Sequence, residues 1–549
     1  MEAKLLSCMA KVFPDEIPSR YAQMDSAASF LNESICFQLA YRSEKVTSFR
    51  IRMNGPGPVR MYRVQPVAVQ LPVLRNGDPD YLRCEPGLYP DFLDDCPLGL
   101  VLEADENWRC LFLEVEPYTL PAGLHRFEIC LNGLNGSILC EKTMLVRVIG
   151  TELPGHNLMY TRWFHCDALS TYYNVPVFSE AHWKIIENFL QKAVQRGMNM
   201  VLTPIHTPPL DTDIGAERQT VQLVKVIRNN PERYEFDFSL LDRWIHLCLR
   251  LGIQYFEMAH LYTQWGAAAA PKITAWTQDG ERRIFGWDTP ACGEEYRNFL
   301  SQYLPALTKH LHALGVFDRC YFHISDEPGR ENRDAYLAAK SQVARYLNGF
   351  PLIDALSDAT LFDDGTVDRP VAATDAIGPF LERKVPGLWA YYCCGQHLDV
   401  SNSFIAMPGE RTRILGVQLY KYQIAGFLQW GYNFYFGRNS RYLINPFRTS
   451  DGDGCWPAGD PFLVYPSADG CAMDSLRGYL MQKALDDVRA LRLLETLMGR
   501  ESVISLLDRT LGEDLSFTAY PRGEKAFLGF RTNLENEIIK NLSLQAVTR

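Results

Sequence analysis

RCYFHISDEPGREN, residues 319–332, is the segment that decides the fold, because an apolar run ends there in two adjacent carboxylates, Asp326 and Glu327. The side chains before this pair alternate in polarity as they do in a β-strand. Pro328 has no N–H to donate to a neighbouring strand, so we expect the strand to end at this point. A helical pattern follows over residues 332–347. A strand that delivers acidic side chains at its C-terminal end and continues into a helix is typical of a β/α barrel, which places catalytic groups there.

A simpler interpretation of the same segment is that Ser325 or Asp326 only caps the next helix. Short polar side chains do accept hydrogen bonds from the first N–H groups of a helix. A cap needs one such residue, however, and it explains neither Glu327 nor His323 beside it. We therefore expect Asp326 and Glu327 to be the catalytic residues.

Helix, glycine and strand follow one another three times in the middle of the chain. The helical patterns end at Gly197, Gly252 and Gly315, and a strand-like apolar run begins after each of them. Strands that alternate with helices in this way are parallel. A first strand near residue 160 precedes these units, and four candidates follow them, namely PLIDALSD, VAATDAI, LWAYYCCG and IAGFLQWGYNFYFG. This brings the number of strands to about eight and predicts a (β/α)8 TIM-like barrel over residues 151–495.

The regions on either side of the predicted barrel have other patterns. Residues 1–150 contain six strand-like runs separated by turn-rich pieces, and in HRFEICL (125–131) hydrophobic residues alternate with others, as in a sheet with one buried face. We predict an N-terminal β-sandwich with a supporting or carbohydrate-gripping role. Residues 496–549 are mostly helical in pattern and are expected to pack on the barrel as a C-terminal extension. The predicted fold class is therefore α/β.

Composition restricts the partners of this protein. The chain has 549 residues, of which 47% are hydrophobic, enough for two or three domains with sizeable cores. Its net charge of −10 disfavours binding to nucleic acid or to an anionic membrane, because both require a basic surface. No apolar run reaches transmembrane length, and the first residues lack the apolar region and cleavage site of a secretory signal. A homodimer is expected only because it is the commonest oligomer.

The cysteines and histidines argue against a metal or disulfide framework. Fifteen cysteines, an odd number without CxxC spacing, include the adjacent pair Cys393 and Cys394. We expect reduced thiols and a cytoplasmic location. The histidines of the predicted barrel rim lie on separate strands and no HExxH motif occurs, so we predict no metal site and no cofactor.

Aromatic and polar side chains follow most of the predicted barrel strands. Because the carboxyl ends of the strands meet at one rim, we expect these side chains to form one site. They are Trp163, His165 and Asp167 after the first strand, His206 after the second, Glu257 and His260 on the third, His323 on the fourth, Tyr391, Tyr392, Gln396 and His397 at the end of the seventh, and Trp430, Tyr432, Asn433 and Tyr435 at the end of the eighth. Each tryptophan or tyrosine alone is as well explained by packing. Together they suit a sugar, whose ring faces stack on aromatic side chains while its hydroxyls need hydrogen-bond partners.

Several separate motifs, in one order, resemble a known family. They are TRWFHCD, YFHISDEP, WAYYCCGQ, GFLQWGYNFY, DGDG and FLVYP, distributed over roughly residues 155–540. The chain resembles the catalytic domain of glycoside hydrolase family 123, long catalogued as domain of unknown function 4091. The resemblance implies a retaining exo-β-N-acetylgalactosaminidase with a β-sandwich before the barrel, a glycan with terminal β-linked N-acetylgalactosamine as substrate, and substrate-assisted chemistry. The family's Asp-Glu pair falls on Asp326 and Glu327.

Substrate assistance is consistent with two adjacent carboxylates. In the usual retaining glycosidase the acid and the nucleophile lie about 5 to 5.5 Å apart on opposite sides of the sugar, and the predicted seventh strand offers no carboxylate. If the substrate's 2-acetamido oxygen is the nucleophile, Glu327 is the general acid and base, and Asp326 stabilises the acetamido group. Tyr392 or Tyr435 is then expected to hold the acetamido oxygen, and Trp430 to contact the N-acetyl methyl group.

Two alternatives remain at the level of the sequence. The first is a two-carboxylate retaining galactosidase without need of an N-acetyl group, with Glu327 as acid and Glu257 or another residue as nucleophile. The second is a carbohydrate-binding barrel without turnover, against which the presence of both Asp326 and Glu327 argues. The partner of the sugar 4-hydroxyl is not determined by the sequence, and His165 and Asp167 are candidates.

Overall fold

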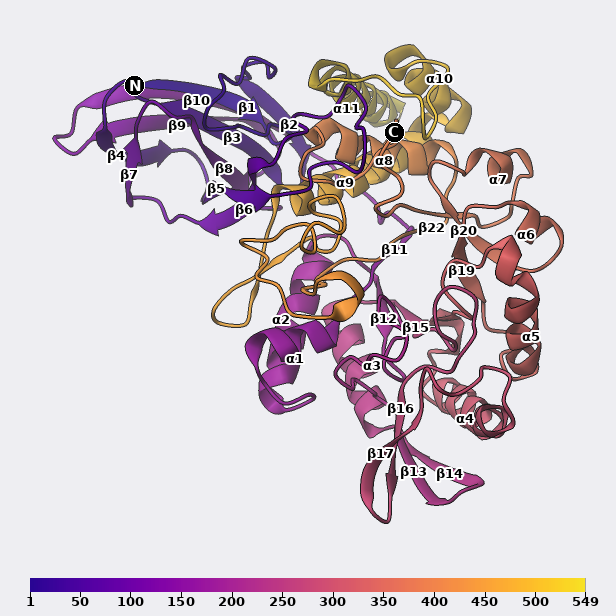
Figure 1. Cartoon of the computed structure of the whole chain (residues 1–549). Helices are drawn as coiled ribbons and strands as arrows, with labels where there is room; N and C mark the ends of the chain where they lie inside the picture. The colour runs from indigo at the N-terminus through magenta and orange to yellow at the C-terminus, as the bar shows by residue number, and fades with distance from the viewer. Residues whose placement is uncertain (549) are drawn as a thin grey trace.

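The computed structural model describes residues 1–548, which form an N-terminal β-sandwich, a β/α barrel and a group of C-terminal helices (Figure 1). The predicted α/β fold class is thereby confirmed. The division into domains at residues 150 and 495 stays a prediction, and α9 (Leu476–Met498) runs across the second of these positions.

Two five-stranded sheets make the sandwich. The first contains, in spatial order, β1 (Glu2–Ser7), β3 (Ile35–Arg42), β8 (Arg109–Val115), β5 (Arg60–Val69) and β6 (Gly87–Asp95). The second contains β2 (Ser26–Phe30), β10 (Ile138–Ile149), β9 (Gly123–Gly133), β4 (Thr47–Asn54) and β7 (Val101–Ala104). Apolar side chains from both sheets fill the space between them, among them Phe37, Leu111 and Ile129. The alternation in β9 predicted this, since Phe127, Ile129 and Leu131 are buried there.

The six predicted sandwich strands correspond to β3, β4, β5, β8, β9 and β10, whereas β1, β2, β6 and β7 were not predicted. β6 illustrates the reason. It contains Pro90 and ends in two aspartates, a composition that weakens the strand pattern, and it lies at the edge of its sheet. Edge strands tolerate proline because the N–H groups on one side of their backbone have no neighbouring strand to donate to.

Eight parallel strands form the barrel. Their spatial order is β18 (Cys320–Phe322), β15 (Tyr255–Met258), β12 (Met200–Thr203), β11 (Met159–Arg162), β22 (Gly426–Gln429), β21 (Trp389–Tyr391), β20 (Arg369–Ala373) and β19 (Ile353–Leu356). A parallel bridge between Phe322 and Leu352 joins the two end strands, and the Phe322 N–H donates to the Pro351 carbonyl at 2.9 Å. The predicted eight-stranded barrel is thus confirmed.

Alternation in β18 determines which side chains face the barrel interior. Tyr321 packs there with residues of other strands such as Val371 and Leu428. Cys320 and Phe322 belong instead to the core between the strands and the surrounding helices. The strand pattern read from the sequence therefore places Asp326 and Glu327 beyond its C-terminal end.

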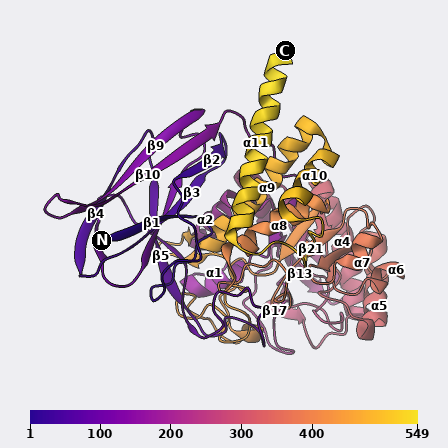
Figure 2. The same cartoon turned by 90° about the horizontal axis from the view of Figure 1, so that it is seen from above.

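Helices surround the barrel and close one end of the molecule. Those of the barrel region are α1 (Cys166–Tyr173), α2 (Glu180–Gln195), α3 (Ser239–Leu251), α4 (Glu294–Ala313), α5 (Arg333–Val343), α6 (Thr360–Asp363), α7 (Gly378–Glu382) and α8 (Gly409–Lys421). After α9 the chain continues with α10 (Arg500–Leu511) and α11 (Glu524–Thr548), and Figure 2 shows α11 extending past the other helices. Within residues 1–548, no helix combines the length and apolar character that crossing a membrane requires.

A small four-stranded sheet, which the sequence did not predict, projects from the barrel at the bottom of Figure 1. Its strands are β14 (Arg233–Asp237), β13 (Lys225–Asn230), β16 (Ile273–Thr277) and β17 (Gly280–Phe285). It is built from the long connections that follow barrel strands β12 and β15. These connections also reach the rim of the barrel.

Buried ion pairs join the sandwich to the helices, and we call this set of contacts the ionic seam. Arg477 of α9 binds Asp91 of β6 through two hydrogen bonds of 2.9 Å, and both side chains are fully buried. Further along, Glu33 accepts from Lys483 of α9 at 3.1 Å and from Arg531 of α11 at 2.7 Å. A buried charge without its partner is strongly unfavourable, so these pairs fix the sandwich against α9 and α11.

We expect Arg477→Met to lower the free energy of unfolding by about 3 to 5 kcal/mol, because it leaves Asp91 buried without a cation. Arg63→Met is the matched control, since its partner Asp94 forms a largely exposed pair that contributes about 0 to 1 kcal/mol. Chemical denaturation of both variants measures the difference. Equal losses would show that the buried pair has no special role, and Arg477→Met with Asp91→Leu should recover part of the stability.

Candidate active site

A cleft of about 180 Å³ lies at the C-terminal ends of the barrel strands. Loops after six of the eight strands contribute to it. The lining residues are Trp163, His165, Leu210, Asp211, Gln264, Trp265, Asp326, Glu327, Ala355, Tyr391, Tyr392, Cys393, Cys394, Leu428, Trp430 and Trp456. Four tryptophans and several polar groups therefore surround the two predicted catalytic carboxylates, an arrangement suited to a sugar ring.

Asp326 and Glu327 are held by the backbone that follows β18. Glu327 has a φ of 45°, which is uncommon for a residue with a side chain. The Trp265 N–H donates to the Asp326 carbonyl at 3.3 Å, and the Tyr391 hydroxyl donates to Glu327 Oε1 at 2.8 Å. Neither residue caps a helix, because the N-cap of α5 is Asn332. The interpretation of the DE pair as a simple cap is therefore wrong.

The environment of this pair favours retention of a proton. Desolvation in the cleft raises the pKa of Asp326 well above its usual value, and the neighbouring Glu327 carboxylate raises it further. Desolvation also raises the pKa of Glu327, while the Tyr391 hydrogen bond lowers it. Two adjacent carboxyls in such surroundings resist double ionisation, so one proton is available for transfer.

A chain of buried hydrogen bonds supports the cleft from below. The indole of Trp163 donates to Glu257 at 2.6 Å, and Glu257 bonds His323 at 2.7 Å. His323 bonds Asp354 at 3.1 Å, and Asp354 accepts from the Tyr336 hydroxyl at 2.5 Å. Burial opposes the positive charge of His323, yet the hydrogen bonds to Asp354 and Glu257 hold its pKa at about 10. The chain therefore fixes Trp163 and places the His323 cation between two buried carboxylates.

His260, His323 and Asp354 place one ligand atom each within 4.8 Å of one another, a spacing compatible with a metal ion. Both ring nitrogens of His323 already bind carboxylates, and the imidazole of His260 stacks on it with ring centroids 4.1 Å apart. The group lies beneath the cleft and none of its members lines it. Two of its three members, His323 and Asp354, are therefore already bonded to each other within the hydrogen-bond chain.

Several residues that the sequence placed at the site lie outside the cleft lining. Asp167 forms a buried ion pair with Arg218, with hydrogen bonds of 2.6 and 2.8 Å, which leaves it no oxygen directed at a sugar. His206 is buried and bonds the His260 carbonyl at 2.8 Å. Glu257 and His323 belong to the chain of hydrogen bonds described above. The expectation that these four contact the substrate needs correction, because each is already engaged within the protein.

Residues of the eighth strand region also need correction. Asn433 is buried, and its side chain bonds both the N–H and the carbonyl of His165, at 2.9 and 3.1 Å. The Tyr435 hydroxyl donates to the Val464 carbonyl at 2.9 Å inside the core. Both side chains are used for packing, so Tyr435 is not the tyrosine that faces a substrate. Trp430 does line the cleft, and its indole donates to Asp460 at 2.9 Å.

Tyr391 is the last residue of β21, and it is the hydroxyl of Tyr391, not that of its neighbour Tyr392, that points toward the carboxylates. Tyr392 borders the cleft, but its hydroxyl accepts from Arg162 at 3.1 Å and contacts Met481. The Tyr391 hydroxyl bonds Glu327 instead. Alternation along a strand predicts that only one of two neighbouring residues faces the barrel interior. Tyr391 is that residue, whereas the acetamido contact was expected of Tyr392 or Tyr435.

The loop residues Asp211, Gln264 and Trp265 were not predicted. Asp211 and Trp265 have φ angles of 45° and 58°, and Trp265 is 55% exposed. Asp211 Oδ2 is buried with no hydrogen-bond partner within residues 1–548. Burial raises the pKa of Asp211 to about 6. These residues follow β12 and β15 at some distance, so no strand pattern indicated them.

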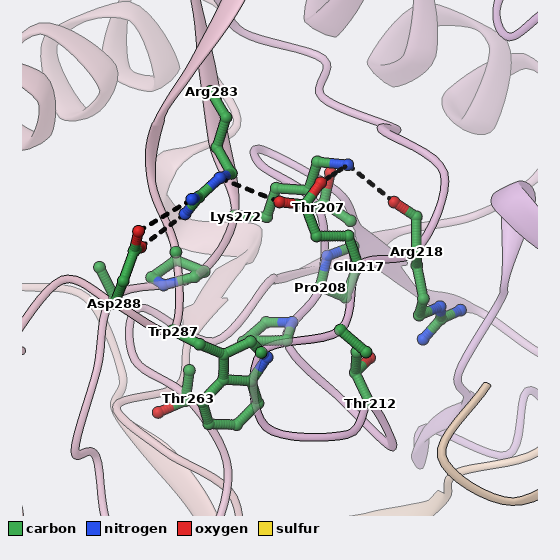
Figure 3. Close-up of a pocket in the computed structure, with 16 residues that line it drawn as sticks. Thr207, Pro208, Thr212, Glu217, Arg218, Thr263, Lys272, Arg283, Trp287 and Asp288 are labelled. Atoms are coloured by element: carbon green, nitrogen blue, oxygen red, sulfur yellow. Dashed lines mark hydrogen bonds and ion pairs between the residues drawn. The ribbon is translucent and has the colours of Figure 1, made fainter. Parts of the chain in front are cut away.

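A second hollow of about 140 Å³ is lined by residues of the connections after β12 and β15, among them Thr212 and Thr263 (Figure 3). Its charged groups bind one another. Arg283 pairs with Asp288 and with Glu217, and Lys272 pairs with Glu217 and donates to the Arg218 carbonyl. These side chains of the hollow therefore have partners of opposite charge, whereas within residues 1–548 the carboxyls that line the cleft have no cation bonded to them.

Comparison with known proteins agrees with the geometry. A model described as the catalytic domain of glycoside hydrolase 123 matches residues 163–494. A family 123 glycoside hydrolase from Clostridium perfringens, whose structure was reported for glycolipid glycan hydrolysis, superposes with a TM-score of 0.75 at 16% identity and covers 100% of this chain and 99% of its own.

More distant likenesses involve β-glucuronidases. Those of Parabacteroides merdae and Bifidobacterium dentium each show a TM-score of 0.30 at 10% identity over 82% of this chain, covering 50% and 62% of their own chains. No curated protein matches this sequence. The β-glucuronidase likenesses are too weak to carry an argument.

The buried charge of His323 should make stability depend on pH. Its folded pKa of about 10 exceeds the unfolded value of 6.5, so its contribution is complete below pH 6.5 and is lost as pH rises toward 10. We expect His323→Asn to be strongly destabilised near pH 6.5. Between pH 6.5 and 10 its free energy of unfolding should not show the decrease with pH that the native protein shows. Urea denaturation across the range measures both effects.

The exposed His246 provides the control, since His246→Asn should keep the native stability and slope. A His323→Asn variant that retains the full slope would contradict the assignment of the charge to His323.

Proposed function

Since this chain belongs to glycoside hydrolase family 123, we propose that it is a retaining exo-β-N-acetylgalactosaminidase acting on glycans with terminal β-linked N-acetylgalactosamine. In this proposal the 2-acetamido oxygen of the substrate attacks the anomeric carbon, and an oxazoline-like intermediate forms. The observation that carries the proposal is the position of Asp326 and Glu327, which are adjacent in one cleft and share its desolvated environment.

The engagement of Glu257 speaks against the two-carboxylate alternative in its expected form. Glu257 is fully buried and is bonded by Trp163 at 2.6 Å, Thr161 at 2.8 Å and His323 at 2.7 Å. A nucleophile needs a free oxygen directed at the anomeric carbon. Glu257 has none to offer, and Asp211 is the remaining carboxylate that lines the cleft.

Glu327 acts in the proposal as general acid and then as general base. Its raised pKa keeps the proton that the leaving oxygen needs, and its exposure to the cleft lets it reach that oxygen. In the second step the ionised Glu327 deprotonates the water that opens the oxazoline. Asp326 accepts the acetamido N–H and stabilises the positive charge that develops on ring closure. The raised pKa values of the pair also argue against a binding protein without turnover, because such a protein needs no proton donor.

We assign Asp211 to recognition of a sugar hydroxyl. Its backbone is fixed, because its N–H bonds Gln264 and its carbonyl accepts from Ser440 at 2.7 Å. Its unpartnered buried oxygen is costly in the free protein and gains a partner when a hydroxyl donates to it. A site of this kind discriminates between sugars that differ in one hydroxyl. Asp211 therefore replaces His165 and Asp167 as the candidate for the 4-hydroxyl.

The tryptophans complete the proposed sugar site. Trp163 is held by Glu257, and Trp430 by Asp460, whose pKa burial raises to about 7 despite the hydrogen bonds from Trp430 and Gln429. Both rings are thus fixed before a substrate arrives, which reduces the entropy lost on binding. We keep the proposal that Trp430 contacts the N-acetyl methyl group. The cytoplasmic location and a homodimer stay predictions.

Asp326→Asn tests substrate assistance. The change keeps the volume but replaces an acceptor by a group that presents an NH₂ to the substrate N–H, so we expect kcat to fall by about 10² to 10³. Aryl β-glycosides with and without a 2-acetamido group provide the assay, and native enzyme should hydrolyse only the acetamido sugars. A thiazoline analogue of the intermediate should inhibit the native enzyme well and the variant poorly.

If a fluorinated sugar labels the protein covalently, the proposal of substrate assistance is wrong. Mass spectrometry of the labelled peptide would then identify the nucleophile, and an adduct on Asp211 would establish a two-carboxylate mechanism. Hydrolysis of plain galactosides at the same rate as N-acetylgalactosaminides would point to the same conclusion.

Tyr391→Phe tests the link between Tyr391 and Glu327. The Tyr391 hydrogen bond lowers the pKa of Glu327, so its loss should raise that pKa. Because the protonated acid is the active form, the alkaline limb of kcat/KM should move to higher pH. Tyr392→Phe, whose hydroxyl bonds Arg162, should leave the limb in place. A limb that moves to lower pH in Tyr391→Phe would refute this role.

A further inference from the structure

Two adjacent thiols, Cys393 and Cys394, lie in the wall of the cleft beside the catalytic pair. Both follow directly on β21, which ends at Tyr391, and both line the cleft with Asp326 and Glu327. All fifteen cysteines are free thiols, and seven of them are buried in the cores. Cys393 and Cys394 are partly exposed and are the one pair adjacent in sequence. The proposed hydrolysis uses neither thiol.

The loop that carries the two thiols is firmly held. The N–H and the thiol of Cys393 both donate to the side-chain oxygen of Gln396, at 2.9 and 3.3 Å. Gln396 in turn donates to Asp375 at 2.9 Å, and Asn402 donates to the Cys393 carbonyl at 3.0 Å. The backbone at Cys393 is thus fixed where the two cysteines line the cleft.

The neighbouring thiol affects the ionisation of Cys393. Cys394, followed by burial and the nearby carboxylate of Glu327, raises the pKa of Cys393 well above its usual value. A thiol in this state reacts slowly with reagents that require one thiolate, because the thiolate is the nucleophile. Two neighbouring sulfurs can still act together on an atom that accepts both. Soft atoms are the ones that sulfur ligands select.

We propose that Cys393 and Cys394 form a dithiol site that captures trivalent organoarsenicals of the form R–As=O. Two S–H bonds and the As=O bond break, two As–S bonds form, and the oxygen leaves as one water molecule with the two thiol protons. Arsenic stays trivalent and no sulfur is oxidised, so the reaction needs no further reagent. Because the sulfurs border the cleft, the group R then occupies space next to Glu327 and Trp430 and excludes the sugar.

Adjacency of the thiols determines the strength of capture. Once one sulfur has bound arsenic, the other attacks within the same molecule at a high effective concentration. Loss of either thiol should therefore weaken capture by about 10² to 10⁴-fold. The isolated exposed cysteines Cys84, Cys292 and Cys471 lack an adjacent sulfur in sequence, and we expect them to bind the same reagent weakly and reversibly.

Phenylarsine oxide and the full chain provide the test. Intact-protein mass spectrometry should show one tightly held phenylarsenic group per chain, and peptide mapping should locate it on the peptide with residues 393 and 394. Removal should require a dithiol such as 2,3-dimercaptopropanol and should not occur with a monothiol. Cys393→Ser and Cys394→Ser should each lose the tight adduct, whereas Cys471→Ser should keep it.

Three results would overturn the proposal: no tight adduct on the native chain, an adduct mapped elsewhere, or an adduct that persists when both Cys393 and Cys394 are replaced by serine. Circular dichroism establishes that each variant is folded, and mapping on the native chain decides the question even if a variant is not. The mass measurement needs no sugar substrate, so it stands if the proposed N-acetylgalactosaminidase activity fails. If the protein hydrolyses the sugar substrate, this activity should fall in proportion to the amount of phenylarsenic adduct formed.

Discussion

A charge removed from water must find a partner, and most of this structure follows from that constraint. The ionic seam meets it with ion pairs such as Arg477 with Asp91, which fix the sandwich against α9. The chain below the cleft meets it by placing His323 between Glu257 and Asp354. In the cleft the constraint is left unmet. Desolvation raises the pKa of both Asp326 and Glu327, and the Glu327 carboxylate raises that of Asp326 further, so a proton is retained.

Closure of the barrel turns these local arrangements into one site. Eight parallel strands bring their carboxyl ends to one rim, so residues far apart in sequence, such as Trp163, Glu327 and Trp430, line one cleft. The chain from Trp163 to Tyr336 then links the cleft wall to α5. The rim is thus rigid where aromatic rings must be oriented, and the hydrogen bonds responsible lie under it.

Backbone strain also occurs at the cleft. Asp211, Trp265 and Glu327 have positive φ angles, and all three line the cleft. Such conformations cost of order 1 to 3 kcal/mol each and persist only where the surroundings enforce them. Gln264 and Ser440 hold Asp211, and the Trp265 N–H holds Asp326. The stability given up here is supplied by the cores and the ionic seam, which are remote from the chemistry.

The sequence by itself determined the barrel, the sandwich and the position of the Asp326–Glu327 pair, because strand alternation and helix-ending glycines are local patterns and because Asp326 and Glu327 follow a strand closely. Only the tertiary structure decided which other rim residues face the cleft. Alternation ceases to specify direction where a strand ends, and beyond that point partners distant in sequence fix each side chain. Arg218 draws Asp167 away from the cleft, and Gln264 with Ser440 turns Asp211 into it. The fold was therefore predictable from short-range periodicity, whereas the substrate-facing surface depended on long-range hydrogen bonds.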